Sequence, residues 1–240
     1  MKYIYGPVNS RRIGRSLGVS LTPLKICSFD CVYCQLGRAC NSTTVERREY
    51  IKIEEVIEEL KSWFANNPEE AKQLNFITIS GMGEPTLHSR LGEFIAQAKK
   101  ITNTPIALIT NSSLLTDASV RKEILAVDLI APSLDAATDA AFQRVDRPHQ
   151  GIKLEGIIEG LFSLKKEFRG KIWLEVMLVK GVNDDLRHIK RLKEAVDKID
   201  PDKIQLNSPV RSPSKAMARS VGKNKLAKIK GILGAKCEII

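Results

Sequence analysis

Hydrophobic and polar positions along the chain follow two alternating patterns, one typical of strands and one typical of helices. Short apolar runs end at turn residues and are followed by stretches in which apolar residues recur every three or four positions. The clearest of these stretches carries Ile53, Val56, Ile57, Leu60 and Phe64 on one face of a predicted helix. The pattern therefore predicts strands and helices in regular alternation.

The alternation can be counted as six strand–helix units. The expected strands cover 17–21, 75–80, 105–110, 128–134, 171–179 and 203–206, and the expected helices cover 53–64, 91–101, 118–125, 138–144, 154–168, 184–199 and 223–233. Asp117 is placed to cap the helix that begins at Ala118. Such alternation predicts an α/β fold with parallel strands and right-handed crossovers, either a doubly wound sheet or a barrel. Periodicity alone does not choose between these two architectures.

Polar residues gather where the expected strands end. The segments concerned are Ser80–Pro85, Thr110–Asn111, Ser133–Asp135, Lys180–Asp184 and Asn207–Pro209. In both candidate architectures ligands bind at the carboxyl ends of the strands, which share one rim. The sequence therefore predicts a site at this rim, and the loop after the first strand belongs to it.

That first loop contains the residues Cys27, Cys31 and Cys34, in the spacing C-x3-C-x2-C. Three thiolates can hold three corners of a cubic iron–sulfur cluster, which leaves the fourth iron open to an outside ligand. An alternative is a closed structural site, of zinc or iron and sulfur, with Cys40 as the fourth ligand. Cys237 lies far from this group and is expected to pack in the core.

The cysteine loop, with Tyr33 just before its last cysteine, resembles the signature of radical S-adenosylmethionine enzymes. The segment Gly81-Met-Gly-Glu-Pro85 is similar to the Gly-Gly-Glu segment of that family, with Met82 inserted. The resemblance covers residues 18–207. The sequence from Gly6 to Gly37 resembles a subgroup related to wyosine-base tRNA synthases. The wyosine-base synthases carry extra N-terminal cysteines, whereas no cysteine precedes Cys27 in this sequence.

The resemblance implies a partial (β/α)6 TIM-type barrel with parallel strands, which holds a [4Fe–4S] cluster and S-adenosylmethionine. The cluster ligands would be Cys27, Cys31 and Cys34. Glu84 and the carbonyls near Gly81 and Gly83 would bind the methionyl ammonium. The ribose and the carboxylate would be bound by Asn111, Ser133 and Asp135, and the adenine would lie against Tyr33. The enzyme would cleave S-adenosylmethionine reductively to a 5′-deoxyadenosyl radical, which takes a hydrogen atom from the substrate. A flavodoxin- or ferredoxin-type protein would supply the electron.

Size and charge bear on the substrate and on the location. We expect one domain over residues 1–240, with its core at 18–207 and a basic C-terminal segment at 208–240. The net charge is +10, with eight Lys or Arg and no acid between Arg211 and Lys236, and with a second basic cluster at Arg11, Arg12 and Arg15. These residues either bind phosphates or form a solvated surface. No membrane-length apolar run or secretory signal is seen, and clustered cysteines favour the reducing cytoplasm.

Three hypotheses for function follow. The favoured one is hydrogen abstraction from a large or phosphate-bearing substrate, such as tRNA. The second is an enzyme that modifies, or installs a radical on, a protein partner. The third is a non-catalytic iron–sulfur or zinc protein with Cys40 as fourth ligand. The histidines His88, His149 and His188 have no partners at metal-ligand spacing and are expected on the surface or in loops.

Overall fold

The computed structural model describes residues 1–37, 43–210 and 218–240. Its eight strands form one sheet in sequence order, and every neighbouring pair is parallel except the first, β1 with β2. The strands are β1 (Ile4–Ser10), β2 (Gly14–Val19), β3 (Phe76–Ile79), β4 (Ile106–Thr110), β5 (Leu129–Pro132), β6 (Lys171–Met177), β7 (Lys203–Asn207) and β8 (Cys237–Ile239). The six expected strands are β2 to β7, so the predicted partial barrel is confirmed. The strands β1 and β8 were not predicted.

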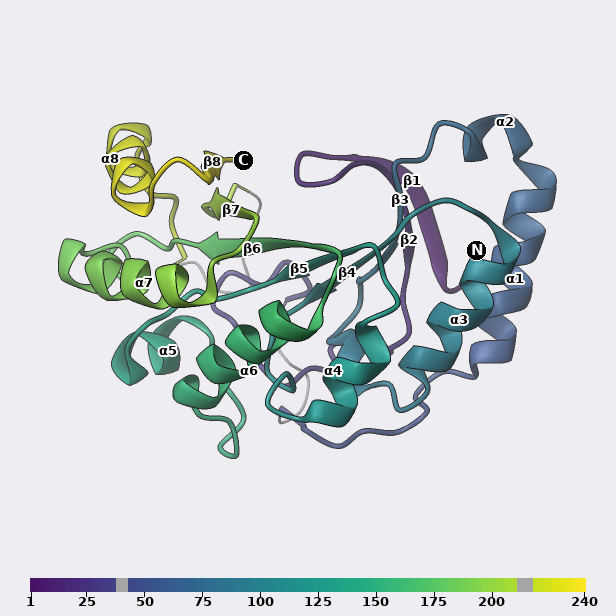
Figure 1. Ribbon diagram of the computed structural model, residues 1–240, viewed down its shortest axis with the longest axis horizontal. Coiled ribbons are helices and arrows are strands. Elements are labelled where there is room, and N and C mark those ends of the chain that lie inside the picture. Colours follow the sequence, from purple (N-terminus) through teal and green to yellow (C-terminus); the bar gives the residue numbers. More distant parts are fainter. Residues whose placement is uncertain (38–42, 211–217) are drawn as a thin grey trace.

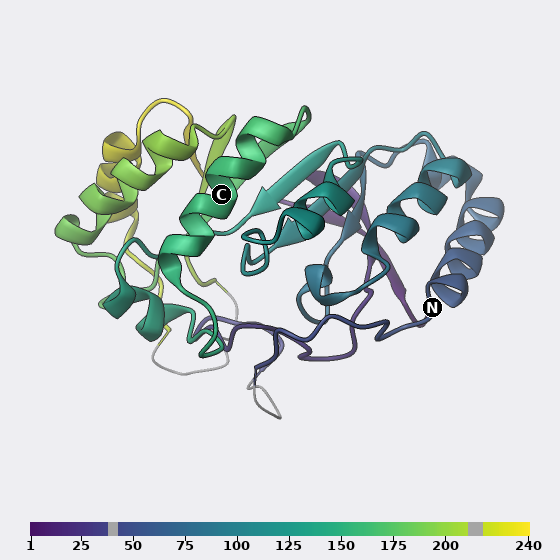
Figure 2. The ribbon, with the colours of Figure 1, turned by 60° about the horizontal axis from the view of Figure 1, so that its bottom comes forward.

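The helices lie outside the curved sheet, as Figures 1 and 2 show. They are α1 (Ile53–Asn66), α2 (Pro68–Ala71), α3 (Leu91–Ile101), α4 (Ala118–Ile124), α5 (Asp139–Val145), α6 (Leu154–Glu167), α7 (Leu186–Ile199) and α8 (Lys223–Leu233), with a short 3-10 turn, η1, at Pro85–Leu87. Asp117 caps α4 as predicted, since its side chain accepts a hydrogen bond from Ser119 N. On α1 the buried aromatic residue is Trp63, while the predicted Phe64 is only partly buried.

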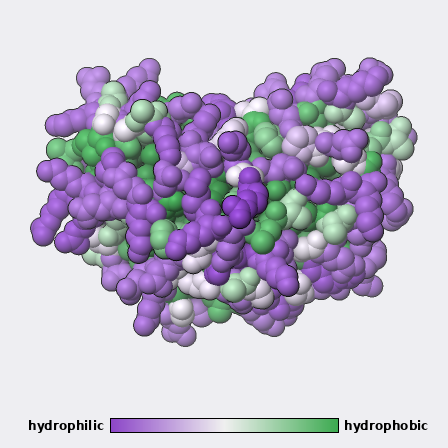
Figure 3. All heavy atoms as spheres, in the orientation of Figure 1, coloured by the Kyte–Doolittle hydropathy of each residue, from purple (hydrophilic) through white to green (hydrophobic). Residues whose placement is uncertain are grey.

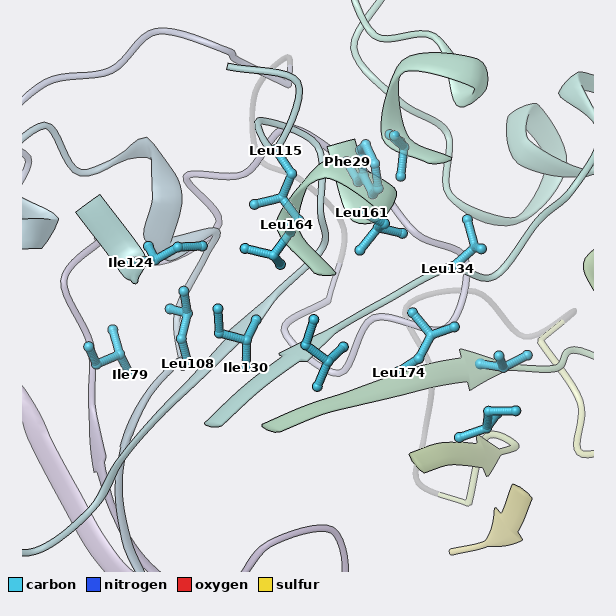
Figure 4. Packing of buried hydrophobic residues seen from close by; sticks show 14 of the residues in the cluster. Phe29, Ile79, Leu108, Leu115, Ile124, Ile130, Leu134, Leu161, Leu164 and Leu174 are labelled. Carbon is cyan, nitrogen blue, oxygen red and sulfur yellow. The ribbon is translucent and has the colours of Figure 1, made fainter. Parts of the chain in front are cut away.

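Alternate residues of each strand face opposite sides of the sheet. Ile79, Leu108, Ile130 and Leu174 project toward the helices and join Ile124, Leu161 and Leu164 in the main core (Figure 4). A second, smaller cluster of Ile13, Ala107 and Leu129, with Phe76, Ile109 and Trp173 packed against it, lies on the inner face. The sheet therefore buries both faces, as parallel sheets do.

The turn between β1 and β2 reaches across the open barrel to β6 and β7. Gln205 Nε2 on β7 donates a hydrogen bond to Arg12 O at 2.7 Å, and Arg12 Nη2 lies 2.7 Å from Glu175 Oε2 on β6. In Figure 1 this hairpin, in purple, extends toward β7 and β8. Arg12 was expected on a phosphate-binding or solvated surface, and the structure instead turns it into the barrel.

Two of the three histidines are buried. His188 lies on α7, contrary to the prediction of a surface or loop position, whereas His88 lies in the loop after η1. His88 is 0% exposed, and His188, on the buried face of α7, is 4% exposed. His88 Nε2 contacts Ile51 O at 2.8 Å, and its Nδ1 accepts a hydrogen bond from Arg90 N at 3.2 Å. These partners require a neutral ring, with the proton on Nε2.

This environment predicts that acid destabilises the protein. Burial lowers the pKa of His88, so below about pH 6.5 the unfolded chain takes up a proton that the folded ring resists. The free energy of unfolding is expected to fall below that pH, by up to about 1.4 kcal/mol per pH unit for this group. Urea titrations between pH 5 and 8 should show a shallower pH dependence in His88→Gln. The control His149→Gln should keep the wild-type slope, and an unchanged slope in His88→Gln would contradict the assignment.

The outer surface seen in the orientation of Figure 3 is largely hydrophilic, with smaller hydrophobic patches between. Among the described residues, no helix has the length and apolar character that crossing a membrane requires.

Candidate active site

The cysteine loop follows β2 and packs against the end of α5. The ring of Phe29 meets the ring of Phe142 edge to face, with centroids 5.5 Å apart. Val32 N donates to Val145 O at 2.9 Å, and Asp30 N to Asp146 O at 3.1 Å. The aromatic contact and the backbone hydrogen bonds fix the loop across the rim, so it is held by residues more than 100 positions away in sequence.

The start of the cysteine loop also lies along the segment 81–84 that follows β3. Lys25 N donates to Met82 O at 2.6 Å, and Glu84 N donates to Ile26 O at 2.9 Å. Gly83 permits this approach, since a Cβ there would stand 2.0 Å from Ile26 O. Gly81 has a φ of +112°, which disfavours other residues. The Gly-Met-Gly-Glu segment and the cysteine loop therefore form one structural unit.

Glu84 ties β3 to β4. Its Oε1 accepts hydrogen bonds from Thr86 N (3.1 Å), Thr86 Oγ1 (2.7 Å) and Thr110 Oγ1 (2.7 Å), and its Oε2 accepts one from Asn111 N (2.7 Å). Burial raises the pKa of Glu84, and these four donors act against that rise. The Glu84 carboxylate therefore already accepts four hydrogen bonds within the protein. The backbone carbonyls of the segment 81–84 are the remaining acceptors for the methionyl ammonium.

A small cleft opens beside the cysteine loop. Four of the predicted cofactor residues line it, namely Tyr33, Asn111, Ser133 and Asp135. The Tyr33 hydroxyl donates to Asp135 Oδ2, and Asp135 Oδ1 accepts from Met177 N at 2.7 Å. The lining of the cleft does not include Gly81, Gly83 or Glu84. Glu84 nevertheless accepts a hydrogen bond from the backbone N–H of Asn111, which does line the cleft. The structure therefore brings the predicted residues to one rim.

Each of the three thiols has a polar neighbour. Cys27 Sγ accepts from Asn111 Nδ2 at 3.5 Å, Cys34 Sγ accepts from Lys25 Nζ at 3.3 Å, and the Cys31 thiol points at Asp146 Oδ1, 3.7 Å away. Such outer contacts orient ligands and tune a cluster. Burial, followed by the charge of Glu84, raises the pKa of Cys27 to about 12, and burial raises that of Cys31 well above its usual value. Thiolates here need a positive partner, which iron provides.

A single metal ion fits this loop less well than a cluster does. Within the described ranges, no three His, Cys, Asp or Glu side chains converge as one ion requires. A cubic cluster takes one thiolate at each of three separate irons. Cys40, the fourth ligand of the alternative closed site, falls outside the described residues, as does the part of the basic segment at 211–217.

Lys25 is expected to raise the reduction potential of a bound cluster. Its ammonium lies 3.3 Å from Cys34 Sγ, and a positive charge favours the state with one more electron. Lys25→Met should therefore shift the midpoint potential, measured by redox titration with EPR detection, to more negative values. Lys25→Arg should keep most of the wild-type potential, and Lys72→Met, at the end of α2, serves as a distant charge control. A wild-type potential in Lys25→Met would contradict this role.

Sequence reasoning missed several residues of the site. Asp146 is 3% exposed, lines the cleft and contacts Cys31, and burial raises the pKa of both Asp146 and Asp135. Ser28 Oγ accepts a hydrogen bond from Asn111 Nδ2 at 2.9 Å and forms another with Ser113 Oγ at 2.6 Å. These residues are brought in by long-range packing, which spacing along the chain does not reveal.

The Radical SAM superfamily matches residues 21–192, which is most of the chain. The chain therefore belongs to the Radical SAM superfamily and is an enzyme of that class. Within it, the chain is similar to a UPF0026 protein of Methanocaldococcus jannaschii, with 35% identity over 89% of this chain and 65% of that protein.

The chain is also similar to two proteins that are not called UPF0026. A protein of Brachyspira hyodysenteriae called GTPase Obg is 38% identical over 99% of this chain, which spans only 34% of that protein. A probable dual-specificity RNA methyltransferase of Thermotoga maritima, RlmN, is 24% identical over 89% of this chain and 61% of its own length. The chain thus spans 34% of the Brachyspira protein and 65% of the Methanocaldococcus protein.

Among solved structures, a radical SAM methyltransferase from Sphaerobacter thermophilus has a TM-score of 0.71 at 17% identity, covering 94% of this chain and 65% of that one. This likeness supports the fold. Members of the superfamily use a [4Fe–4S] cluster and S-adenosylmethionine, and the three free thiols of the cysteine loop match the chemistry of such a cluster.

Proposed function

We propose that this enzyme abstracts a hydrogen atom from a nucleotide of an RNA substrate, of which tRNA is the leading candidate. When bound, the cluster and S-adenosylmethionine supply an electron and a 5′-deoxyadenosyl radical. In this proposal Cys27, Cys31 and Cys34 hold the cluster. The cleft of Tyr33, Asn111, Ser133 and Asp135, with the segment Gly81–Glu84, orients S-adenosylmethionine beside it.

The observation that carries the RNA proposal is the charge of helix α8 at the last edge of the sheet. Its Leu226, Ile229 and Leu233 are buried, while Lys223, Lys228 and Lys230 are exposed. Exposed lysines at the edge of an open barrel suit a phosphate backbone, because phosphate contacts dominate the affinity of proteins for nucleic acid. The kinship with proteins called RNA methyltransferases points the same way.

The other parts of the proposal concern the partners and the location. A flavodoxin- or ferredoxin-type protein is the expected electron donor, and the reducing cytoplasm is the expected compartment, because an open-cornered cluster needs both a reductant and protection from oxidants. We take the whole chain as one catalytic domain.

The experiment is a salt titration combined with an activity assay. The anaerobically reconstituted protein should bind bulk tRNA with an affinity that falls steeply with salt. The triple Lys→Gln variant at 223, 228 and 230 should reduce the steepness of this salt dependence by about 0.9 for each phosphate that it no longer neutralises. Lys61→Gln and Lys72→Gln, on α1 and after α2, are matched controls. Bulk tRNA should also increase 5′-deoxyadenosine formation under dithionite. Failure to bind tRNA at low ionic strength would refute the proposal.

A further inference from the structure

The barrel interior contains buried polar atoms without hydrogen-bond partners. Arg12 Nε and Nη2 and Gln205 Oε1 find no hydrogen-bond partner among the described residues, and Gln205 is only 1% exposed. Arg12 Nη2 lies 2.7 Å from Glu175 Oε2, an ion-pair distance that lacks the alignment of a hydrogen bond. Unpartnered buried groups are uncommon and each costs about 1–3 kcal/mol.

These atoms lie on one part of the inner face, directly inside the rim. Glu175 and Gln205 are register neighbours on β6 and β7, and Arg12 reaches them from the β1–β2 turn. Glu175 Oε1 accepts from Asn207 Nδ2 at 3.2 Å, and its Oε2 lies 3.5 Å from Ser133 Oγ. Ser133 also lines the cleft assigned to the cofactor. The interior group therefore adjoins the cleft that the proposed function assigns to S-adenosylmethionine.

On the side of the interior formed by β1, β2 and β3, polar side chains hydrogen-bond to one another. Ser16 Oγ and Thr78 Oγ1 hydrogen-bond to each other, and the Tyr5 hydroxyl pairs with Ser80 Oγ at 2.7 Å. Those residues belong to β1, β2 and β3 or directly follow β3. Among the described residues, the other buried side-chain atoms without a hydrogen-bond partner are Arg15 Nε on β2 and the ring nitrogens of His188 on α7. Arg12 and Gln205 differ from them because they meet each other and Glu175 beside β6 and β7, which marks this side as the one prepared for a ligand.

We propose that Arg12, Glu175 and Gln205 bind the nucleobase of the RNA nucleotide that reacts, an inference that rests on the proposed function. The guanidinium offers donors, and Gln205 Oε1 and the Glu175 carboxylate offer acceptors. The charges of Arg12 and Glu175 cancel, so the group suits a neutral ligand with adjacent donors and acceptors rather than a phosphate. The edge of a nucleobase has this arrangement, and enzymes that act on a base take it out of its stack into an interior site.

The test measures how far bulk tRNA stimulates 5′-deoxyadenosine formation, as the ratio of the rates with and without tRNA. Gln205→Met removes the free acceptor at similar side-chain length, and Arg12→Lys keeps a positive charge near Glu175 but removes Nε. Each variant should lower the ratio about tenfold, the loss expected for one base-specific contact. Thr78→Val, in the satisfied part of the interior, should keep the wild-type ratio. Affinity for tRNA is measured in parallel and should stay near that of the wild type, since α8 supplies the phosphate contacts.

A wild-type ratio in Gln205→Met and Arg12→Lys would overturn the nucleobase assignment and leave the proposed function standing. An equal drop in Thr78→Val would also overturn it, because the effect would then follow from disturbing any part of the interior. No stimulation of the wild-type protein by tRNA would overturn the proposed function and this inference together.

Discussion

Replacing Cys31 with serine is expected to abolish cluster binding and S-adenosylmethionine cleavage. A cubic cluster with three protein ligands loses one corner, and the buried loop offers serine only a weak, hard oxygen ligand in place of a thiolate. Iron and sulfide content after anaerobic reconstitution, the visible absorption of the cluster and 5′-deoxyadenosine formation should all fall to background. Cys27→Ser and Cys34→Ser should give the same result.

Two other cysteines provide the controls. Cys237 is 1% exposed and packs in the core as predicted, so Cys237→Ala should keep the cluster and activity at a modest cost in stability. Cys40→Ser separates the open-cornered cluster from the closed four-thiolate site. Retained iron and activity in Cys40→Ser agree with the enzyme, whereas loss of iron equal to that in Cys31→Ser would favour the closed site.

The Gly83→Ala variant is expected to be destabilised and to bind iron poorly. The added Cβ would stand 2.0 Å from Ile26 O and 2.7 Å from Thr22 Oγ1, and one of these atoms is backbone. The loop must therefore move, which costs about 1–3 kcal/mol or more for the overpacking and breaks the hydrogen bond from Glu84 N to Ile26 O. Urea denaturation of the apo protein and iron content after reconstitution measure the two effects.

Gly231→Ala is the matched control for this change. Gly231 lies in α8 and a Cβ there has no heavy atom within 4 Å, so the variant should be as stable as the wild type or slightly more so. If Gly83→Ala keeps both wild-type stability and wild-type iron content, the close approach of the cysteine loop to segment 81–84 is not required.

The sequence predicted the regular part of the fold well because buried parallel strands and amphipathic helices have strong local periodicity. It did not predict β1, whose segment Ile4–Ser10 includes Gly6 and Pro7 and pairs antiparallel with a neighbour across a tight turn. The strand β8 has only three residues, too few for a period to appear. On α1, Trp63 and Phe64 are adjacent, and only three-dimensional packing decides which is buried.

The candidate site was predicted where chemistry depends on residue type and spacing, and missed where it depends on tertiary contact. The cysteine spacing and the polar strand ends are visible in the sequence itself. The place of Asp146 beside Cys31 depends on how α5 ends against the loop, and the contact of Lys25 with Cys34 depends on a positive backbone φ of 65° at Lys25. Arg147, which follows α5, pairs with Asp30 of the cysteine loop at 3.2 Å, a contact that tertiary packing alone reveals.

The turn at Arg12 has a consequence for the order in which the chain folds. Its contact with Gln205 joins residues 193 positions apart, so the N-terminal hairpin cannot dock until β7 has left the ribosome. Until then the inner face of the growing sheet is exposed to water, and its polar residues are hydrated rather than buried. The long loop also makes this closure slow relative to the local strand–helix contacts. We therefore expect the barrel to close last, after the cysteine loop has already met its neighbours on β3 and β4.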